Sequence, residues 1–135
     1  MPFVLDNSVS AAWVIENQAT AYADAVATSL QRDSAFVPAL WQLEFTNVLR
    51  TACIRGRLDA QRAQAMMVQV LSLPITVDRD PVRPAEILAL ALRHALSSYD
   101  AAYLELALRL QVPIATQDEA LAVAAVASGV GVLKA

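Results

Sequence analysis

Cysteine, histidine and lysine are almost absent from this sequence of 135 residues, since each occurs only once. The single Cys53 excludes an internal disulfide framework, and together with the lone His94 it excludes a cysteine-rich zinc site. We expect Cys53 to be a buried thiol on a helix. The only lysine, Lys134, is next to last. A receiver-type phosphorylation module needs a lysine beside its aspartates, so the sequence is a poor match for that class.

Long hydrophobic runs are missing as well. The longest uncharged apolar stretch, residues 121–133, is interrupted by Ser128, Gly129 and Gly131, and it falls short of the about 20 apolar residues that cross a bilayer. The N-terminal segment MPFVLD has no basic region followed by a hydrophobic one, which is the pattern of a signal peptide. The sequence therefore predicts a cytoplasmic protein without a membrane span.

The composition is that of a folded domain, with 57% apolar and 17% charged residues. At this length we expect a single domain, residues 1–135, with a substantial core. The net charge of −3 argues against a broad basic face for nucleic acid. It does not exclude a nucleic-acid enzyme, because carboxylates that hold divalent cations make the metal-free protein more negative.

Short apolar segments alternate with longer helical patterns along the chain. Short segments that are apolar throughout are typical of strands covered on both faces, and we expect strands at residues 3–5, 35–37, 75–77, 113–115 and 131–133. Helices are predicted at residues 19–31, 40–54, 59–71, 84–95, 98–110 and 117–127, with a shorter one ending at Val14. This alternation predicts a parallel sheet with helices on both faces.

Four acidic residues, far apart in the chain, fall near the carboxyl ends of the predicted strands. Asp6 follows the first strand and Asp118 lies just past the fourth, while Asp100 and Glu44 lie in the first turns of their helices. Ligands of open parallel sheets bind beyond these strand ends. Gathered carboxylates repel one another unless cations or protons neutralise them, and Mg²⁺ and Mn²⁺ prefer oxygen ligands. The pattern predicts a divalent metal site.

An ordinary role at the N-terminal end of a helix is the alternative for Asp100 and for Asp118. Asp100 follows Ser97 in the spacing S-x-x-D, which is that of a capping box. Thr116 and Glu119 have the spacing T-x-x-E, so we expect them to cap the next helix and to leave Asp118 spare. Otherwise Asp118 is simply an acid in the first turn, where the helix dipole favours negative charge.

Glu44 is the most informative of the four acids. Its neighbours one turn away on the helix are Leu40, Trp41, Asn47 and Val48, and three of these are core-type residues. The carboxylate therefore belongs to an apolar stripe, unless it lies at the stripe's edge. Because an unpaired buried carboxylate is costly, we expect a cation or a hydrogen-bond donor beside Glu44.

The remaining polar groups have ordinary interpretations. Asp6 could cap the short helix that ends at Val14, although Ser8 already fills that role adequately. Glu105 precedes Arg109 by four residues, which predicts an exposed ion pair worth a few tenths of a kcal/mol. The acids at residues 78–81 are expected to lie in a polar loop.

Four segments together resemble the PIN-domain family, and specifically its VapC-type toxins. They are V-L-D-N-S-V, L-W-Q-L-E-F-T-N-V-L, Y-D-A-A-Y-L-E-L-A and P-I-A-T-Q-D-E-A-L, in an order and spacing that run from Phe3 to about Leu133. The resemblance implies an α/β fold, a three-layer α/β/α sandwich around a short parallel sheet. It also implies metal-site residues at Asp6, Glu44, Asp100 and Asp118, supported by the hydroxyls of Ser8 and Thr116.

The resemblance further implies a function. It implies a metal-dependent endoribonuclease that is the toxin of a type II toxin–antitoxin system. The expected cofactor is Mg²⁺ or Mn²⁺, and the expected substrate is RNA. The expected partners are an antitoxin protein and a second copy of the chain in a homodimer. The stripe with Met66 and Met67 on the helix at 59–71 is a candidate face for a second copy or an antitoxin helix, or it packs on its own sheet. The alternative function is a catalytically inactive PIN-like module that binds RNA or protein.

Overall fold

A parallel sheet of four short strands forms the centre of the computed structural model, which describes residues 1–135. The strands lie in the order β3-β2-β1-β4, with bounds β1 (Phe3–Leu5), β2 (Ala35–Val37), β3 (Ile75–Val77) and β4 (Ile114–Ala115). β1 is therefore an inner strand, paired in parallel with both β2 and β4.

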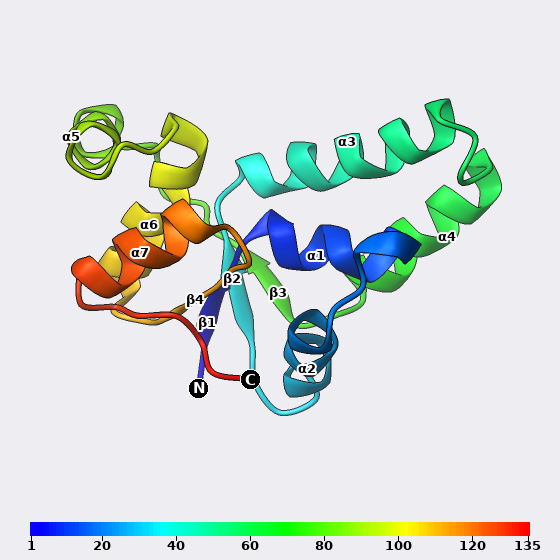
Figure 1. Ribbon diagram of the computed structural model, residues 1–135, viewed down its shortest axis with the longest axis horizontal. Helices are drawn as coiled ribbons and strands as arrows, with labels where there is room; N and C mark the ends of the chain where they lie inside the picture. Colours follow the sequence, from blue (N-terminus) through cyan, green and yellow to red (C-terminus); the bar gives the residue numbers. More distant parts are fainter.

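Seven α-helices and one 3₁₀ helix connect the strands: α1 (Asn7–Val14), η1 (Glu16–Gln18), α2 (Ala21–Ser29), α3 (Leu40–Ile54), α4 (Ala60–Leu71), α5 (Pro84–His94), α6 (Ser98–Leu110) and α7 (Glu119–Ala127). Figure 1 shows α5, α6 and α7 on one side of the sheet and α1 to α4 on the other. The three-layer α/β/α sandwich expected from the sequence is confirmed. No helix is long and apolar enough to cross a membrane.

The predicted bounds of α3 and α6 agree with the structure, and the other helices differ by one to two residues at their ends. The main error concerns residues 131–133, where we expected a fifth strand. Only an isolated bridge between Ile114 and Val132 forms there. Gly129 and Gly131 have φ angles of +86° and +77°, which break the extended conformation that a strand requires.

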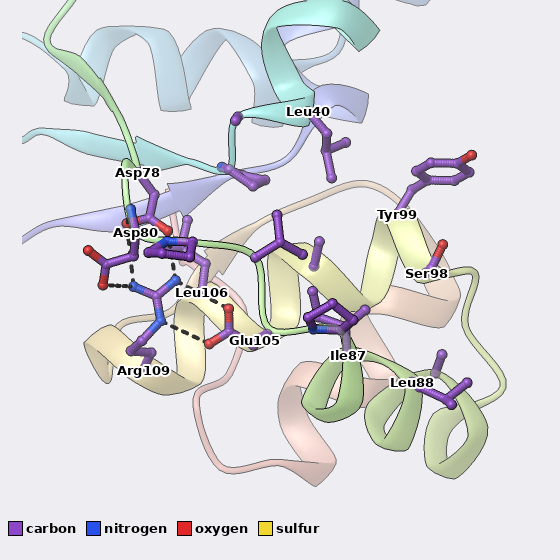
Figure 2. A pocket seen from close by; sticks show the side chains of 17 residues that line it. Leu40, Asp78, Asp80, Ile87, Leu88, Ser98, Tyr99, Glu105, Leu106 and Arg109 are labelled. Atoms are coloured by element: carbon purple, nitrogen blue, oxygen red, sulfur yellow. Dashed lines mark hydrogen bonds and ion pairs between the residues drawn. The ribbon is translucent and has the colours of Figure 1, made fainter.

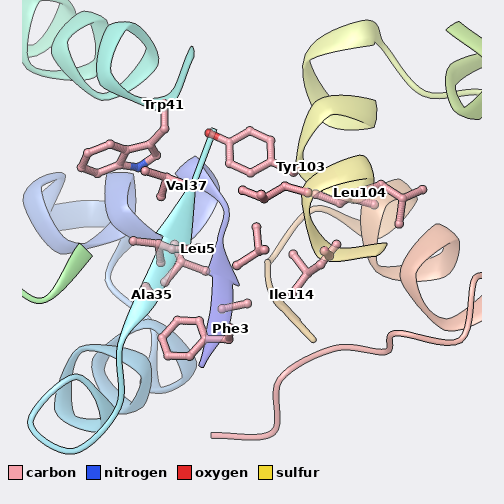
Figure 3. Packing of buried hydrophobic residues seen from close by; sticks show 14 of the residues in the cluster. Phe3, Leu5, Ala35, Val37, Trp41, Tyr103, Leu104 and Ile114 are labelled. Carbon is pink, nitrogen blue, oxygen red and sulfur yellow. The ribbon is translucent and has the colours of Figure 1, made fainter. Parts of the chain in front are cut away.

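The core is one cluster of 26 buried residues on both faces of the sheet. The β1 residues Phe3, Val4 and Leu5 are fully buried, because helices cover both sides of this inner strand (Figure 3). Figure 3 also shows Trp41 and Tyr103 entering the core from α3 and α6.

The methionines of α4 and the single cysteine of α3 can be compared with their expected environments. Met66 and Met67 pack partly buried against the core of their own chain, so the stripe on α4 serves intramolecular packing. Leu71, at the end of the same helix, is exposed. Cys53 lies on α3 as expected, but it is only half-buried.

Candidate active site

The edge of the sheet at which β1 and β4 end brings two distant segments together. Leu5 pairs with Ala115 in the parallel register, and the backbone N–H of Asp6 donates to the Ala115 carbonyl at 3.0 Å. The next residues, Asp6 and Thr116, consequently leave the sheet side by side. This register is the reason that residues from both ends of the chain share one site.

Asp6 is only 4% exposed, and its side chain is held by hydroxyl groups. Its Oδ2 accepts from Ser8 Oγ at 2.6 Å and from Thr116 Oγ1 at 2.9 Å. Burial raises the pKa of Asp6, while the hydrogen bonds from Ser8 and Thr116 lower it. The same oxygen lies 3.4 Å from the Ser8 backbone N–H, so Asp6 is the N-cap of α1, and our assignment of that cap to Ser8 was wrong.

Asp118 caps α7, contrary to the expected pairing of Thr116 with Glu119. Its Oδ2 accepts from the backbone N–H of Leu121 at 2.8 Å. Thr116 lies two residues before that cap, where its Oγ1 accepts from the Asp118 N–H at 3.0 Å and donates to Asp6. The capping box was misplaced because the pairing of β4 with β1 turns the Thr116 hydroxyl toward Asp6.

Asp100 lies in the first turn of α6, whose N-cap is Ser97 as expected. Ser97 Oγ accepts from the Asp100 N–H at 3.1 Å. The Asp100 carboxylate is half-buried, and its pKa is raised by burial and then by the negative charges of Asp6 and Asp118. Asp6 and Asp118 are therefore the acids whose negative charges act on Asp100.

Glu44 reaches the same region from α3. Its Oε1 accepts from the hydroxyl of Tyr103 at 2.6 Å, so the expected hydrogen-bond donor is a tyrosine of α6. Burial raises the pKa of Glu44, the Tyr103 hydrogen bond lowers it, and the charges of Asp6 and Asp100 raise it further.

Sequence reasoning missed Tyr103. The available signal was its spacing, since residues three apart on a helix share a face, and Tyr103 follows Asp100 by three. Burial, followed by the hydrogen bond to Glu44, raises the pKa of Tyr103 above its ordinary value. Tyr103 therefore acts as a donor, not as a charged group.

The four acids form a negative region that no basic side chain neutralises. None of the ion pairs in the structure includes Asp6, Glu44, Asp100 or Asp118. One carboxylate oxygen each of Asp6, Glu44 and Asp118 takes no hydrogen bond from the protein. No three acidic, histidine or cysteine side chains are close enough together to enclose a metal ion. Mg²⁺ ordinarily binds through one or two carboxylates and keeps several waters, so these residues fit a hydrated ion.

Comparisons with known proteins identify the family to which this chain belongs. A family model of the PIN domain matches residues 3–127. This chain belongs to the PIN-domain family. Ribonuclease VapC12 from Mycobacterium tuberculosis, in the strains CDC 1551 / Oshkosh and H37Rv, is 33% identical to it over 119 residues, or 88% of each chain, which places this PIN domain in the VapC-type branch. The crystal structure of PAE2754 from Pyrobaculum aerophilum has the same fold, with a TM-score of 0.73 and 24% identity over 98% of this chain and 88% of that one.

A second polar cluster of this PIN domain surrounds Arg109 of α6, which is 17% exposed (Figure 2). Its guanidinium lies 2.7 Å from Asp78, 2.9 Å from Glu105 and 3.2 Å from Asp80. The predicted ion pair between Glu105 and Arg109 therefore forms, but it is largely buried rather than exposed, and Arg109 also contacts Asp78 and Asp80. The Asp78 N–H donates to the Val37 carbonyl on β2, so the loop after β3 is held to β2 by this bond and to α6 by Arg109. The hydrogen bond from Arg109 lowers the pKa of Asp78.

The Arg109 cluster closes one end of an apolar cavity of about 360 Å³. Figure 2 shows it between α5, α6 and the start of α3, with Leu40 and Tyr99 at the opposite end from Arg109. Tyr99 and Leu106 of α6 line the cavity. Asp100 and Tyr103 do not, so the acidic site and the cavity of this PIN domain lie on different faces of α6.

Proposed function

We propose that this PIN domain, a single unit spanning residues 1–135, is a divalent-metal-dependent endoribonuclease and the toxin of a type II toxin–antitoxin system. The observation that carries the proposal is the group of four carboxylates, from four separate elements, without a basic partner. The relatives at 33% identity are named as ribonucleases, which supports RNA as the substrate.

Asp6, Glu44, Asp100 and Asp118 would hold Mg²⁺, either directly or through its bound waters, with Mn²⁺ as an alternative. When bound, the cation supplies positive charge that stabilises the charge developing on a phosphodiester and promotes attack by water. The acids fit this role because their mutual repulsion is relieved by a cation. The raised pKa values of Asp6, Glu44 and Asp100 have burial and that repulsion as their causes.

The hydroxyls of Ser8 and Thr116 would orient the site. Both donate to Oδ2 of Asp6, which leaves Oδ1 to face the cation. Hydrogen-bond partners of this kind fix the orientation of a metal ligand. Asp118 has one oxygen committed to the cap of α7, so its other oxygen is the one available to the site. Glu44 or Asp100 would help to orient the attacking water.

We further propose a cytoplasmic homodimer that is inhibited by a cognate antitoxin. The support is α5, in which only Ile87 is buried, while Leu88 and Leu92 are 59% and 76% exposed. Large apolar side chains exposed together on one helix mark a surface for a protein partner. Because Met66 and Met67 pack on their own core, α5 replaces the α4 stripe as the candidate interface.

The experiment that tests the nuclease proposal incubates purified protein with a panel of RNAs in Mg²⁺, Mn²⁺ or EDTA. The wild-type protein should cut in either metal and not in EDTA, and Asp100→Asn should be inactive although folded. Cutting that continues in EDTA and in Asp100→Asn would reject the mechanism. Metal binding without any cutting would favour the alternative, an inactive RNA- or protein-binding module.

A further inference from the structure

Tyr103 is a fully buried tyrosine whose hydroxyl has one side-chain partner, the Glu44 carboxylate at 2.6 Å. The bond joins α6 to α3 across 59 positions of sequence. Figure 3 shows the Tyr103 ring projecting from α6 toward the side on which Trp41 lies. The ring belongs to the core, and only its polar end reaches the acidic site.

The backbone that carries Glu44 is fixed by Trp41, one turn earlier on α3. Trp41 is 1% exposed, stacks on Phe45 with ring centroids 5.3 Å apart, and donates from Nε1 to Ser10 Oγ at 3.0 Å. This packing fixes the helix but not the flexible Glu44 side chain. The negative charges of Asp6 and Asp100 repel that side chain, and water beyond the half-buried carboxylate attracts it. A donor from the core is needed to hold it inward.

We infer that Tyr103 is a positioning residue, which holds Glu44 Oε1 so that Oε2 is directed into the acidic site. The inference rests on the proposed function, since it assigns a part in that same site. Asp100 and Tyr103 are one turn apart on α6. This helix therefore sets the position of its own carboxylate, Asp100, and through Tyr103 also the position of the Glu44 carboxylate on α3. The distance between the two acids is thereby fixed by one rigid element.

Isothermal titration with Mn²⁺ tests the inference in four proteins: wild type, Tyr103→Phe, Glu44→Gln and the double variant. Tyr103→Phe should bind Mn²⁺ about 10-fold more weakly, as is typical when a partner of a metal ligand is removed. The double variant should bind no more weakly than Glu44→Gln, because Tyr103 acts through Glu44. In RNA cleavage, Tyr103→Phe should lower kcat and leave KM unchanged.

Tyr99→Phe is the matched control, because it removes a hydroxyl from the same helix where that group is exposed and makes no hydrogen bond within the protein. It should bind Mn²⁺ as the wild type does. Tyr103→Phe could instead cause the same loss of affinity in the wild-type protein and in the Glu44→Gln variant. That result would overturn the inference and indicate a general packing role. Wild-type affinity in Tyr103→Phe would overturn it too.

A second measurement needs no change at position 103. The chain has three tyrosines, so fluorine NMR of protein labelled with 3-fluorotyrosine gives three resonances, assigned by elimination with Tyr22→Phe and Tyr99→Phe. Saturation with Mg²⁺ should shift the Tyr103 resonance, and less so in Glu44→Gln. An unmoved Tyr103 resonance in a protein that binds Mg²⁺ overturns the inference alone. A wild-type protein that neither binds the metal nor cuts RNA overturns the proposed function, and the inference with it.

Discussion

The hydroxyl of Thr116 lies 2.9 Å from Oδ2 of Asp6, although 110 positions of sequence separate the two residues. The same hydroxyl accepts from the Asp118 N–H at 3.0 Å. Thr116 therefore links the cap of α1 to the cap of α7 at the edge where β1 and β4 end. A change at this one position should affect both acids.

Thr116→Val keeps the shape of the side chain and removes the hydroxyl. We expect Mn²⁺ affinity to fall about 10-fold, because Asp6 loses one of its orienting donors. Isothermal titration measures the effect, and Thr46→Val on the exposed surface of α3 is the control. Unchanged Mn²⁺ affinity in Thr116→Val would show that the hydroxyl does not support the site.

Asp6→Asn should stabilise the metal-free protein and abolish the increase in Tm that Mg²⁺ causes. Asparagine is as good an N-cap as aspartate, so α1 keeps its start, while the charge and its repulsion are lost. We expect the Tm in EDTA at pH 7 to rise by about 2–4 °C, which corresponds to roughly 1 kcal/mol. Mg²⁺ should raise the Tm of the wild type but not that of Asp6→Asn. Calorimetry with equal Mg²⁺ effects on both proteins would contradict the metal assignment.

The pH dependence of the metal-free protein follows from the same charges. The pKa values of Asp6, Glu44 and Asp100 are raised, so their charged forms disfavour the folded state. Their destabilising effect is present above the raised folded-state pKa and disappears as pH falls toward the ordinary carboxyl value near 4. Mg²⁺ should therefore raise the Tm more at pH 7 than at pH 5. Thermal unfolding at both values, with and without Mg²⁺, checks this, and an equal gain at both would contradict it.

The stability that the Arg109 cluster contributes should depend on pH in the opposite direction. The pKa of Asp78 is lowered by Arg109, so the stability from this contact is present above the ordinary carboxyl pKa and is lost as pH falls through the lower folded-state value. Arg109→Met should lower the free energy of unfolding at pH 7 by about 2 kcal/mol, because it leaves partly buried acids unpaired. Urea unfolding should show this deficit shrinking below about pH 4. A deficit independent of pH would indicate lost packing alone.

Asp118 combines two roles that substitution can separate. Asp118→Asn keeps the cap of α7 and should leave the Tm nearly unchanged, while Mn²⁺ affinity falls. Asp118→Ala should lower the affinity equally and also cost about 1 kcal/mol of stability, since the cap is lost. Titration and calorimetry on both variants measure the two effects. Full Mn²⁺ affinity in Asp118→Asn would limit this residue to capping.

Much of the local structure was predictable because it depends on neighbours in sequence. The bounds of α3 and α6 follow from helical periodicity and from end signals such as Ser97. Sequence-local rules also suggested that Asp6, Glu44, Asp100 and Asp118 lie toward one edge of the sheet, since each is near a strand end or in the first turns of its helix.

The tertiary structure alone decided which side chains meet. Strand register brings Thr116 to Asp6, and this contact moved the cap of α7 to Asp118 against the local T-x-x-E pattern. The contact between α6 and α3, which lie on opposite sides of the sheet, supplied Tyr103 to Glu44, and the loop after β3 supplied Asp78 to Arg109. Periodicity identifies the face on which a residue lies. Which residues contact that face depends on how distant elements pack, and no local sequence pattern carries this information.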